Sequence, residues 1–172
     1  MRGLEINSCD AGYEVLGLSA RLVGVPFPTT EFFTRNQLTG IRWIACLASE
    51  NPERRYAIGS WPIDFVIRAK IPDPIRAGVD VIKKLTQAAL LIQARLKVRE
   101  GVIVHCDMGI DRTSAVVGTV LALEGYAPED CAQAITQMLI QQQPGWIGEE
   151  YVKDLIKVVR DCATSISEVQ KP

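Results

Sequence analysis

A cysteine and an arginine separated by five residues, Cys106 and Arg112, carry the most evident chemistry in this sequence. A short apolar run over 102–104 precedes them, and an apolar segment over 114–123 follows them and ends near Gly125. The short run is typical of a buried strand, and the longer segment is typical of a buried helix. The pattern therefore predicts a strand, a loop with the cysteine and the arginine, and a helix that begins where the loop ends.

A cysteine in such a loop lies where an anion can be bound. The first N–H groups of a helix have no partner within the helix, and the helix dipole is positive there. The loop can therefore form an anion cradle that stabilises the thiolate of Cys106. Gly109 allows the loop to turn, and the guanidinium of Arg112 can hold a phosphate bidentately. A cysteine buried as a small hydrophobe is the alternative, but the residue types and spacing together favour displacement at phosphorus through a phosphocysteine.

The segment from His105 to Thr113, His-Cys-x5-Arg-Thr, resembles the signature of the cysteine-based protein tyrosine and dual-specificity phosphatases. We call residues 106–112 the signature loop. The resemblance implies that Cys106 is the nucleophile and that His105 braces the loop. The Thr113 hydroxyl can donate a hydrogen bond to the thiolate and help it to leave, although a threonine here is also a typical helix N-cap. The residues implied to bind phosphate are Asp107, Met108, Gly109, Ile110, Asp111 and Arg112.

Phosphoryl transfer to the cysteine requires an acid that protonates the leaving oxygen, and Asp73 is the first candidate. In the resembling family, the acid lies on the loop that enters the long helix before the signature strand. Asp73, within Ile-Pro-Asp-Pro, occupies the matching place in this sequence. An Asp followed by a Pro is also typical of an ordinary helix start.

Two other acids stay open for the same role. Asp64, within Trp-Pro-Ile-Asp, resembles the Trp-Pro-Asp loop of the tyrosine-specific branch, but an extra Ile intervenes and a whole strand still follows. Asp111 lies inside the signature loop, where some lipid phosphatases also carry an Asp. If it is not the acid, Asp111 is a group that orients Arg112 or a charge at the rim.

The composition is that of a single globular domain. The chain has 172 residues, of which 23% are charged, and its net charge is −1, so bulk electrostatics give no case for nucleic-acid or membrane binding. No apolar run reaches the ~18 residues of a membrane-spanning helix, and the N-terminus lacks a secretory pattern. Five cysteines without metal-type spacing and a single His favour a reducing, cytoplasmic compartment, with no metal and no cofactor.

Hydrophobic periodicity predicts both strands and helices around the signature loop. Apolar runs predict a hairpin over 13–25 and three strands, over 41–47, 54–58 and 65–71. Apolar residues at helical spacing predict a short helix capped by Thr29 or Thr30, a long helix over 79–96, and two later helices over 129–141 and 146–162.

This order of elements predicts an α/β fold. A strand, a long helix and a second strand indicate a βαβ unit, so we expect a three-layer-like sandwich, with a central, mainly parallel sheet flanked by helices. Ligands of such sheets bind at the carboxyl ends of the strands, where the signature loop is predicted to lie. We expect residues 1–12 to be a partly disordered N-terminus, residues 13–163 to form the catalytic domain, and residues 164–172 to be a flexible tail.

The resemblance implies a phosphomonoester hydrolase of the dual-specificity-like kind that acts on phosphotyrosine, with phosphoserine and phosphothreonine left open as further substrates. The residues between Cys106 and Arg112 include two acids and no Lys or Arg, which argues against a highly phosphorylated inositol head group. A phosphoinositide or small-molecule phosphatase with the same loop stays an alternative, as does a phosphate-recognising pseudophosphatase. A sulfur-transfer or arsenate-reducing enzyme is a further alternative, for which Cys46 would have to lie beside Cys106. The expected partner is a phosphorylated protein or peptide, and the expected state is a monomer.

Overall fold

One mixed sheet of six strands forms the centre of the molecule. The structure, a computed structural model, describes residues 4–9, 12–36, 38–48, 65–71, 78–143, 145 and 148–169. The strands lie in the order β1-β2-β3-β6-β4-β5. Their bounds are Ile6–Cys9 (β1), Gly12–Val15 (β2), Leu22–Val25 (β3), Ile41–Ala48 (β4), Phe65–Ile71 (β5) and Gly101–His105 (β6).

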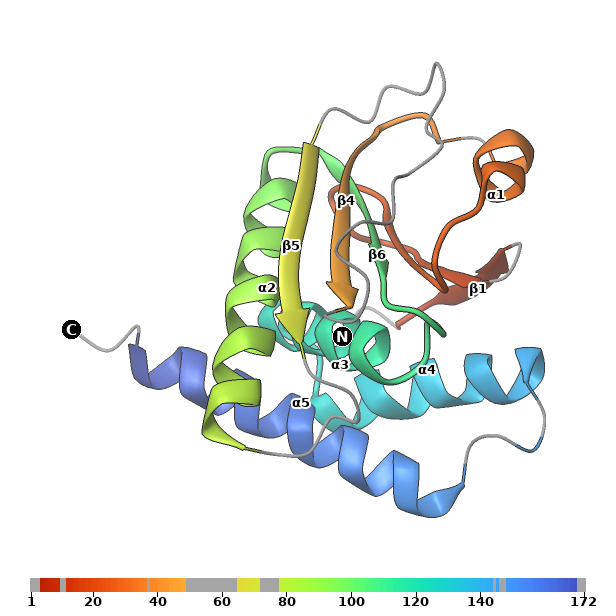
Figure 1. Ribbon diagram of the computed structural model, residues 1–172. Coiled ribbons are helices and arrows are strands. Elements are labelled where there is room, and N and C mark those ends of the chain that lie inside the picture. Colours follow the sequence, from red (N-terminus) through yellow and green to blue (C-terminus); the bar gives the residue numbers. More distant parts are fainter. Residues whose placement is uncertain are drawn as a thin grey trace.

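Helices cover both faces of this sheet (Figure 1). Their bounds are Thr30–Arg35 (α1), Val79–Lys97 (α2), Asp111–Leu123 (α3), Pro128–Gln142 (α4) and Glu149–Val169 (α5). The larger core packs α2, α3, α4 and α5 against one face. A second, smaller core on the other face contains Phe32 and Phe33 of α1. The predicted α/β class, with a mainly parallel sheet between helices, is therefore confirmed.

The central strand β6 contributes to both cores. Val102 and Val104 belong to the larger core and Ile103 to the smaller one, and all three are fully buried. A strand that is buried on both faces has a continuous run of apolar residues, which is why β6 could be predicted from the sequence. β6 pairs in parallel with both β3 and β4, so its carboxyl end, from which the signature loop starts, lies beside theirs.

The parallel and antiparallel pairs follow the predicted elements. β2 and β3 form the predicted antiparallel hairpin, and β4 pairs in parallel with β5. The unit β5-α2-β6 is present, but β4 lies between its two strands in the sheet. The edge strand predicted over 54–58 falls outside the described residues.

Both termini contain more regular structure than the sequence predicts. Within the N-terminal segment that was expected to be partly disordered, β1 pairs with β2 from Ile6 to Cys9. β1 is an edge strand whose residues are exposed or half-buried, so it leaves no apolar run to detect. Helix α5 extends to Val169, well into the expected tail, because Ile166 continues its apolar stripe and is buried in the structure.

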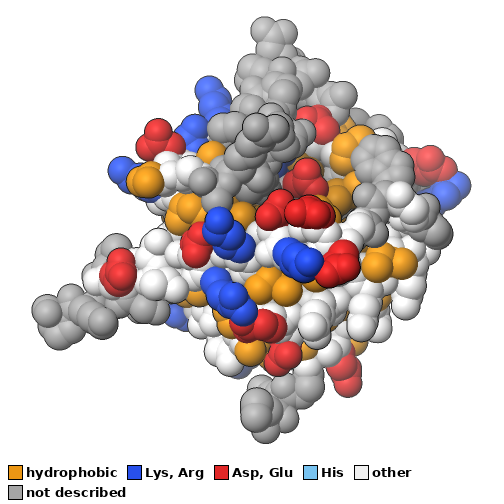
Figure 2. All heavy atoms as spheres, turned by 90° about the horizontal axis from the view of Figure 1, so that it is seen from below, with side chains coloured by type: hydrophobic (Ala, Val, Ile, Leu, Met, Phe, Trp, Pro, Cys, Tyr) orange, Lys and Arg blue, Asp and Glu red, His pale blue; other side chains and the backbone are white. Residues whose placement is uncertain are grey.

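Figure 2, which views the molecule from below relative to Figure 1, shows acidic and basic side chains interspersed on that face. Helix α5 makes two exposed ion pairs, Lys153 with Glu149 at 2.7 Å and Arg160 with Glu129 of α4. Such exposed pairs add little stability. No described helix is long and apolar enough to cross a membrane.

Candidate active site

Helix α3 begins three residues earlier than the hydrophobic pattern predicts. Its first residue is Asp111, and Ile110 is the N-cap, without a side-chain cap hydrogen bond. Arg112 and Thr113 therefore lie in the first helical turn, and the interpretation of Thr113 as the N-cap is wrong. The polar residues of this turn hid the start of the helix, because only the later residues are apolar. The consequence is that the positive end of the helix dipole points directly at the signature loop.

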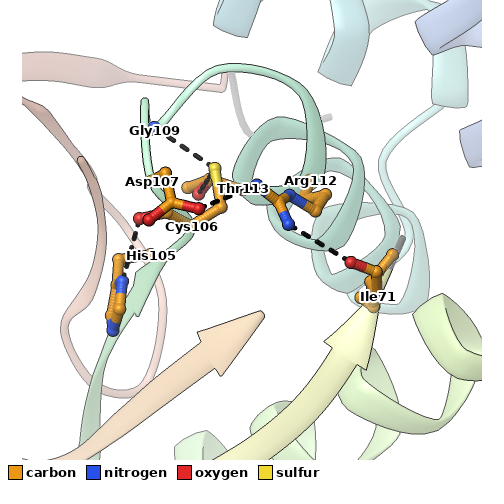
Figure 3. Close-up of polar contacts among 7 residues, drawn as sticks. All are labelled: Ile71, His105, Cys106, Asp107, Gly109, Arg112 and Thr113. Atoms are coloured by element: carbon orange, nitrogen blue, oxygen red, sulfur yellow. Dashed lines mark hydrogen bonds and ion pairs between the residues drawn. The ribbon is translucent and has the colours of Figure 1, made fainter. Parts of the chain in front are cut away.

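The sulfur of Cys106 lies at the centre of the loop and accepts two hydrogen bonds (Figure 3). The backbone N–H of Gly109 donates to Sγ at 3.2 Å, and the hydroxyl of Thr113 donates to it at 3.2 Å. Cys106 is 3% exposed and continues the side of β6 that carries Val104. Donors that converge on a sulfur favour its charged form, so the arrangement suits a thiolate nucleophile.

The guanidinium of Arg112 is almost fully buried beside this sulfur, at 2% exposure. Its Nη1 donates a hydrogen bond to the carbonyl oxygen of Ile71 at 3.2 Å, and its Nη2 lies 3.3 Å from Oδ2 of Asp107 (Figure 3). Asp107 is the residue next to Cys106, and its side chain is 31% exposed. A buried charge needs such partners to be tolerated. The two contacts therefore fix the direction of the arginine before any ligand arrives.

A β-bulge at the end of β5 turns the Ile71 carbonyl toward Arg112. Cys46 of β4 pairs with Arg68, whereas Ala48 pairs with Ile71, so β5 contains one residue more than β4 over this stretch. Within the bulge, Lys70 adopts a φ of 47°, which is rare for a residue with a side chain. Lys84 of α2 donates to the carbonyl oxygen of Lys70 at 3.2 Å. Bulges of this kind re-aim groups beside active sites.

The segment after β3 holds the outer side of the signature loop. The backbone N–H of Phe27 donates to the carbonyl oxygen of Asp107 at 3.1 Å. Gly109 has a φ of 73°, and an added Cβ would lie 2.4 Å from the nitrogen of Pro26. This position therefore requires glycine, both for its backbone conformation and for the close approach of the chain.

His105 lies inside the structure and is not placed as a base. It is fully buried, its Nδ1 lies 3.0 Å from the carbonyl oxygen of Cys106, and its ring meets that of Phe27 edge to face at 5.3 Å. These contacts suit the predicted bracing role.

Two other thiols are poor competitors for this chemistry. Burial raises the pKa of the Cys131 thiol to about 12 and also raises the pKa of Cys162, so neither is a nucleophile near neutral pH. Cys46 lies on β4 directly opposite His105. Because successive strand residues face opposite sides, Cys46 is on the His105 side of the sheet and not on that of Cys106. This placement argues against a resolving thiol at Cys46.

The predicted site residues fall into three groups. Cys106, Asp107, Gly109, Arg112 and Thr113 are brought together by the contacts above. Of the remaining loop residues, Ile110 packs into the core, Met108 is 51% exposed, and Asp111 is half-buried at the start of α3. Asp73 and Asp64 lie outside the described residues, so the identity of the acid stays a prediction. Among the described residues, no group of three or more His, Cys, Asp or Glu could hold a metal ion.

Sequence reasoning did not anticipate two partners of Arg112. It considered an Arg-orienting role for Asp111, and the structure shows that the carboxylate of Asp107 also lies 3.3 Å from the guanidinium. The second partner, the Ile71 carbonyl, is a backbone group, so residue types cannot predict this contact. The strand predicted over 65–71 ends at Ile71, but its prediction did not include a hydrogen bond to Arg112.

Comparisons with known proteins find similarity among solved structures. No protein-family model and no curated protein matches the chain. P. aeruginosa TpbA in complex with pTyr is similar with a TM-score of 0.65 at 14% identity, over 94% of this chain and 95% of that chain. Tk-PTP in its active form is similar with a TM-score of 0.60 at 16% identity, over 84% and 92%. PTPMT1 in complex with PI(5)P has a TM-score of 0.56 at 18% identity, over 86% and 95%.

The fold is that of the tyrosine and dual-specificity phosphatases. It is the fold that the resemblance of the signature loop implied. The match extends over 92–95% of the length of these structures. At such low identity the similarity concerns the fold, and the chemistry depends on the residues described above.

The hydrogen bond from Thr113 predicts a specific change in thiol reactivity. Replacement by valine keeps the shape of this buried side chain but removes the donor, so Thr113→Val leaves the thiolate less stable. We expect Cys106 to be alkylated by iodoacetamide about tenfold more slowly at neutral pH, measured by mass spectrometry of its peptide. The control Thr113→Ser keeps the hydroxyl and should stay near the wild-type rate. Equal rates in all three proteins would show that the contact does not stabilise the thiolate.

Proposed function

We propose that this protein is a phosphomonoester hydrolase that acts through a phosphocysteine, and that its substrate is phosphotyrosine in a protein or peptide. One observation carries the proposal: the sulfur of Cys106 accepts two hydrogen bonds at the positive end of α3, beside a buried arginine. A thiolate held in this way is an activated nucleophile, and a pre-oriented guanidinium is suited to a transferring phosphoryl group. The similarity to TpbA in complex with pTyr supports the same substrate class.

The reaction proceeds in two displacements at phosphorus. In the first, the Cys106 thiolate attacks, an S–P bond forms, the ester P–O bond breaks, and the leaving oxygen takes a proton from the acid. In the second, water attacks the phosphocysteine and gives a proton to the same carboxylate, while the S–P bond breaks. Arg112 holds the phosphoryl oxygens in both steps. Thr113 donates its hydroxyl hydrogen to the departing thiolate in the second.

We assign the acid to Asp73 because of the strand that precedes it. Asp73 is two residues along the chain from Ile71, whose carbonyl oxygen is bound by Arg112. Asp64 precedes Phe65, at the opposite end of β5. A strand of this length spans roughly 20 Å, which disfavours Asp64. Asp111 stays the competitor, since it begins the helix that carries Arg112.

An assay of aryl phosphate hydrolysis with EDTA present tests Cys106 as the nucleophile and Arg112 as the residue that binds the phosphate. Cys106→Ser should lose turnover and keep binding of inorganic phosphate. Arg112→Lys should weaken phosphate binding by about ten- to hundredfold, because an ammonium cannot replace the bidentate fork. The controls Cys9→Ser and Arg160→Lys change the same residue types away from the loop and should keep wild-type activity. Undiminished hydrolysis by Cys106→Ser, or loss of wild-type activity in EDTA, would contradict the proposal.

The acid is identified by the dependence of rate on the leaving group. Asp73→Asn should slow alkyl phosphates by about 10²–10⁴-fold and p-nitrophenyl phosphate much less, because nitrophenolate leaves without a proton. A carboxylic acid must be protonated to act, so the wild-type rate falls as pH rises and the variant should lose this fall. Asp111→Asn and Asp64→Asn are the matched controls. If Asp111→Asn shows the leaving-group effect and Asp73→Asn does not, the acid is Asp111.

A further inference from the structure

Three hydroxyl groups from different elements meet behind the signature loop. They belong to Tyr13 of β2, Ser114 of α3 and Tyr151 of α5. Tyr13 and Ser114 are fully buried and Tyr151 is half-buried. The proposed reaction assigns no role to any of them, although Ser114 directly follows Thr113 in the chain. Burying a hydroxyl costs free energy unless it makes a hydrogen bond, so the position of these three groups requires an explanation.

The Ile110 carbonyl oxygen is the point at which this cluster reaches the loop. It accepts a hydrogen bond from the backbone N–H of Ser114 at 3.0 Å and another from the hydroxyl of Tyr151 at 3.3 Å. A trans peptide is planar, and its N–H points opposite to its C=O. The carbonyl is directed along α3 toward Ser114, so the N–H of Asp111 points out of the helix start, toward the loop. The two donors to Ile110 therefore set the direction of one N–H of the anion cradle.

Tyr13 approaches the same place from the sheet. Its ring passes over Gly24 of β3 so closely that an added Cβ there would lie 2.5 Å from Cζ and 2.7 Å from the hydroxyl oxygen. Burial raises the pKa of Tyr13, and the nearby Ser114 hydroxyl lowers it in part. Even so, neither hydroxyl makes a hydrogen bond of normal geometry with another described residue. The Tyr13 and Ser114 hydroxyls are therefore buried near each other without a hydrogen bond of normal geometry between them.

Electrostatics connect the cluster to the reacting sulfur. Burial raises the pKa of Tyr151 as well, again opposed by Ser114, and the negative charges of Asp111 and Cys106 raise it further. The charge of Cys106 also raises the pKa of Tyr13. Both phenols therefore remain protonated near neutral pH, as hydrogen-bond donors within the field of the thiolate.

We propose that Tyr151 is a positioning residue for the phosphate cradle, supported by Ser114 and Tyr13. Its hydroxyl fixes the Ile110–Asp111 peptide so that the Asp111 N–H faces the bound oxyanion and the thiolate. This inference rests on the proposed function, since it assumes that the cradle binds a phosphoryl group. It assigns to α5, a helix outside the signature loop, a direct influence on the chemistry of that loop.

Tyr151→Phe tests the inference, with Tyr126→Phe as the matched control. Tyr126 follows the other end of α3 and loses the same atom in the control. In Tyr151→Phe we expect the dissociation constant for inorganic phosphate, measured by calorimetry, to rise roughly two- to tenfold. The pH midpoint of Cys106 alkylation should move upward by a corresponding ~0.3–1 unit, because the Asp111 N–H is no longer held in its direction toward the thiolate. Both values should stay at the wild-type level in Tyr126→Phe.

Neither readout requires turnover, so failure of the inference is distinct from failure of the proposed function. If Tyr151→Phe matches Tyr126→Phe in phosphate affinity and in alkylation midpoint, the positioning role is overturned, even if thermal stability falls. A double-mutant cycle of Tyr151→Phe with Ser114→Ala adds a second criterion. Non-additive effects on phosphate affinity would support a shared network, and strictly additive effects would contradict it.

Discussion

The burial of the Arg112 guanidinium is the constraint on which the rest of the site depends. A fixed positive charge at 2% exposure persists only if charge and hydrogen bonds are supplied to it. The loop supplies the charge through Asp107, and the end of β5 supplies an acceptor through the Ile71 carbonyl. The arginine therefore ties an edge strand to the loop that follows the central strand. Its forked donor is oriented by the fold, which lowers the cost of orienting it when a phosphoryl group binds.

The loop was predictable because the proposed chemistry requires particular residue types at particular places. A cysteine, a glycine and an arginine at fixed spacing can be recognised in the sequence. A central strand buried on both faces can also be recognised, because residues 102–104 are all apolar and do not alternate with polar residues. The long helix α2 was equally clear, because Leu85, Ala89, Ile92 and Leu96 are buried at helical spacing. Periodicity was sufficient for the class of fold and for the place of the signature loop between β6 and α3.

The rest depends on contacts that residue types do not encode. The Ile71 carbonyl reaches Arg112 through a bulge, and one extra residue in a strand does not change its apolar pattern. The start of α3 was placed too late because its first turn is polar and carries Asp111, Arg112 and Thr113. Tyr13 and Tyr151 are far apart in the chain and resemble ordinary core residues until folding brings them to the loop. Polar groups that act through backbone atoms are the part of such a site that requires a structure.

The most direct test of the proposed mechanism is to trap the protein during reaction with an aryl phosphate. The wild-type protein is mixed with an aryl phosphate, denatured within the first turnovers, and digested for mass spectrometry. The account predicts one phosphoryl group on the peptide that contains Cys106, and none on the same peptide of Cys106→Ser. Steady hydrolysis without a phosphorylated enzyme, or a phosphoryl group on another residue, would contradict a mechanism in which the loop serves to create and hold a phosphocysteine.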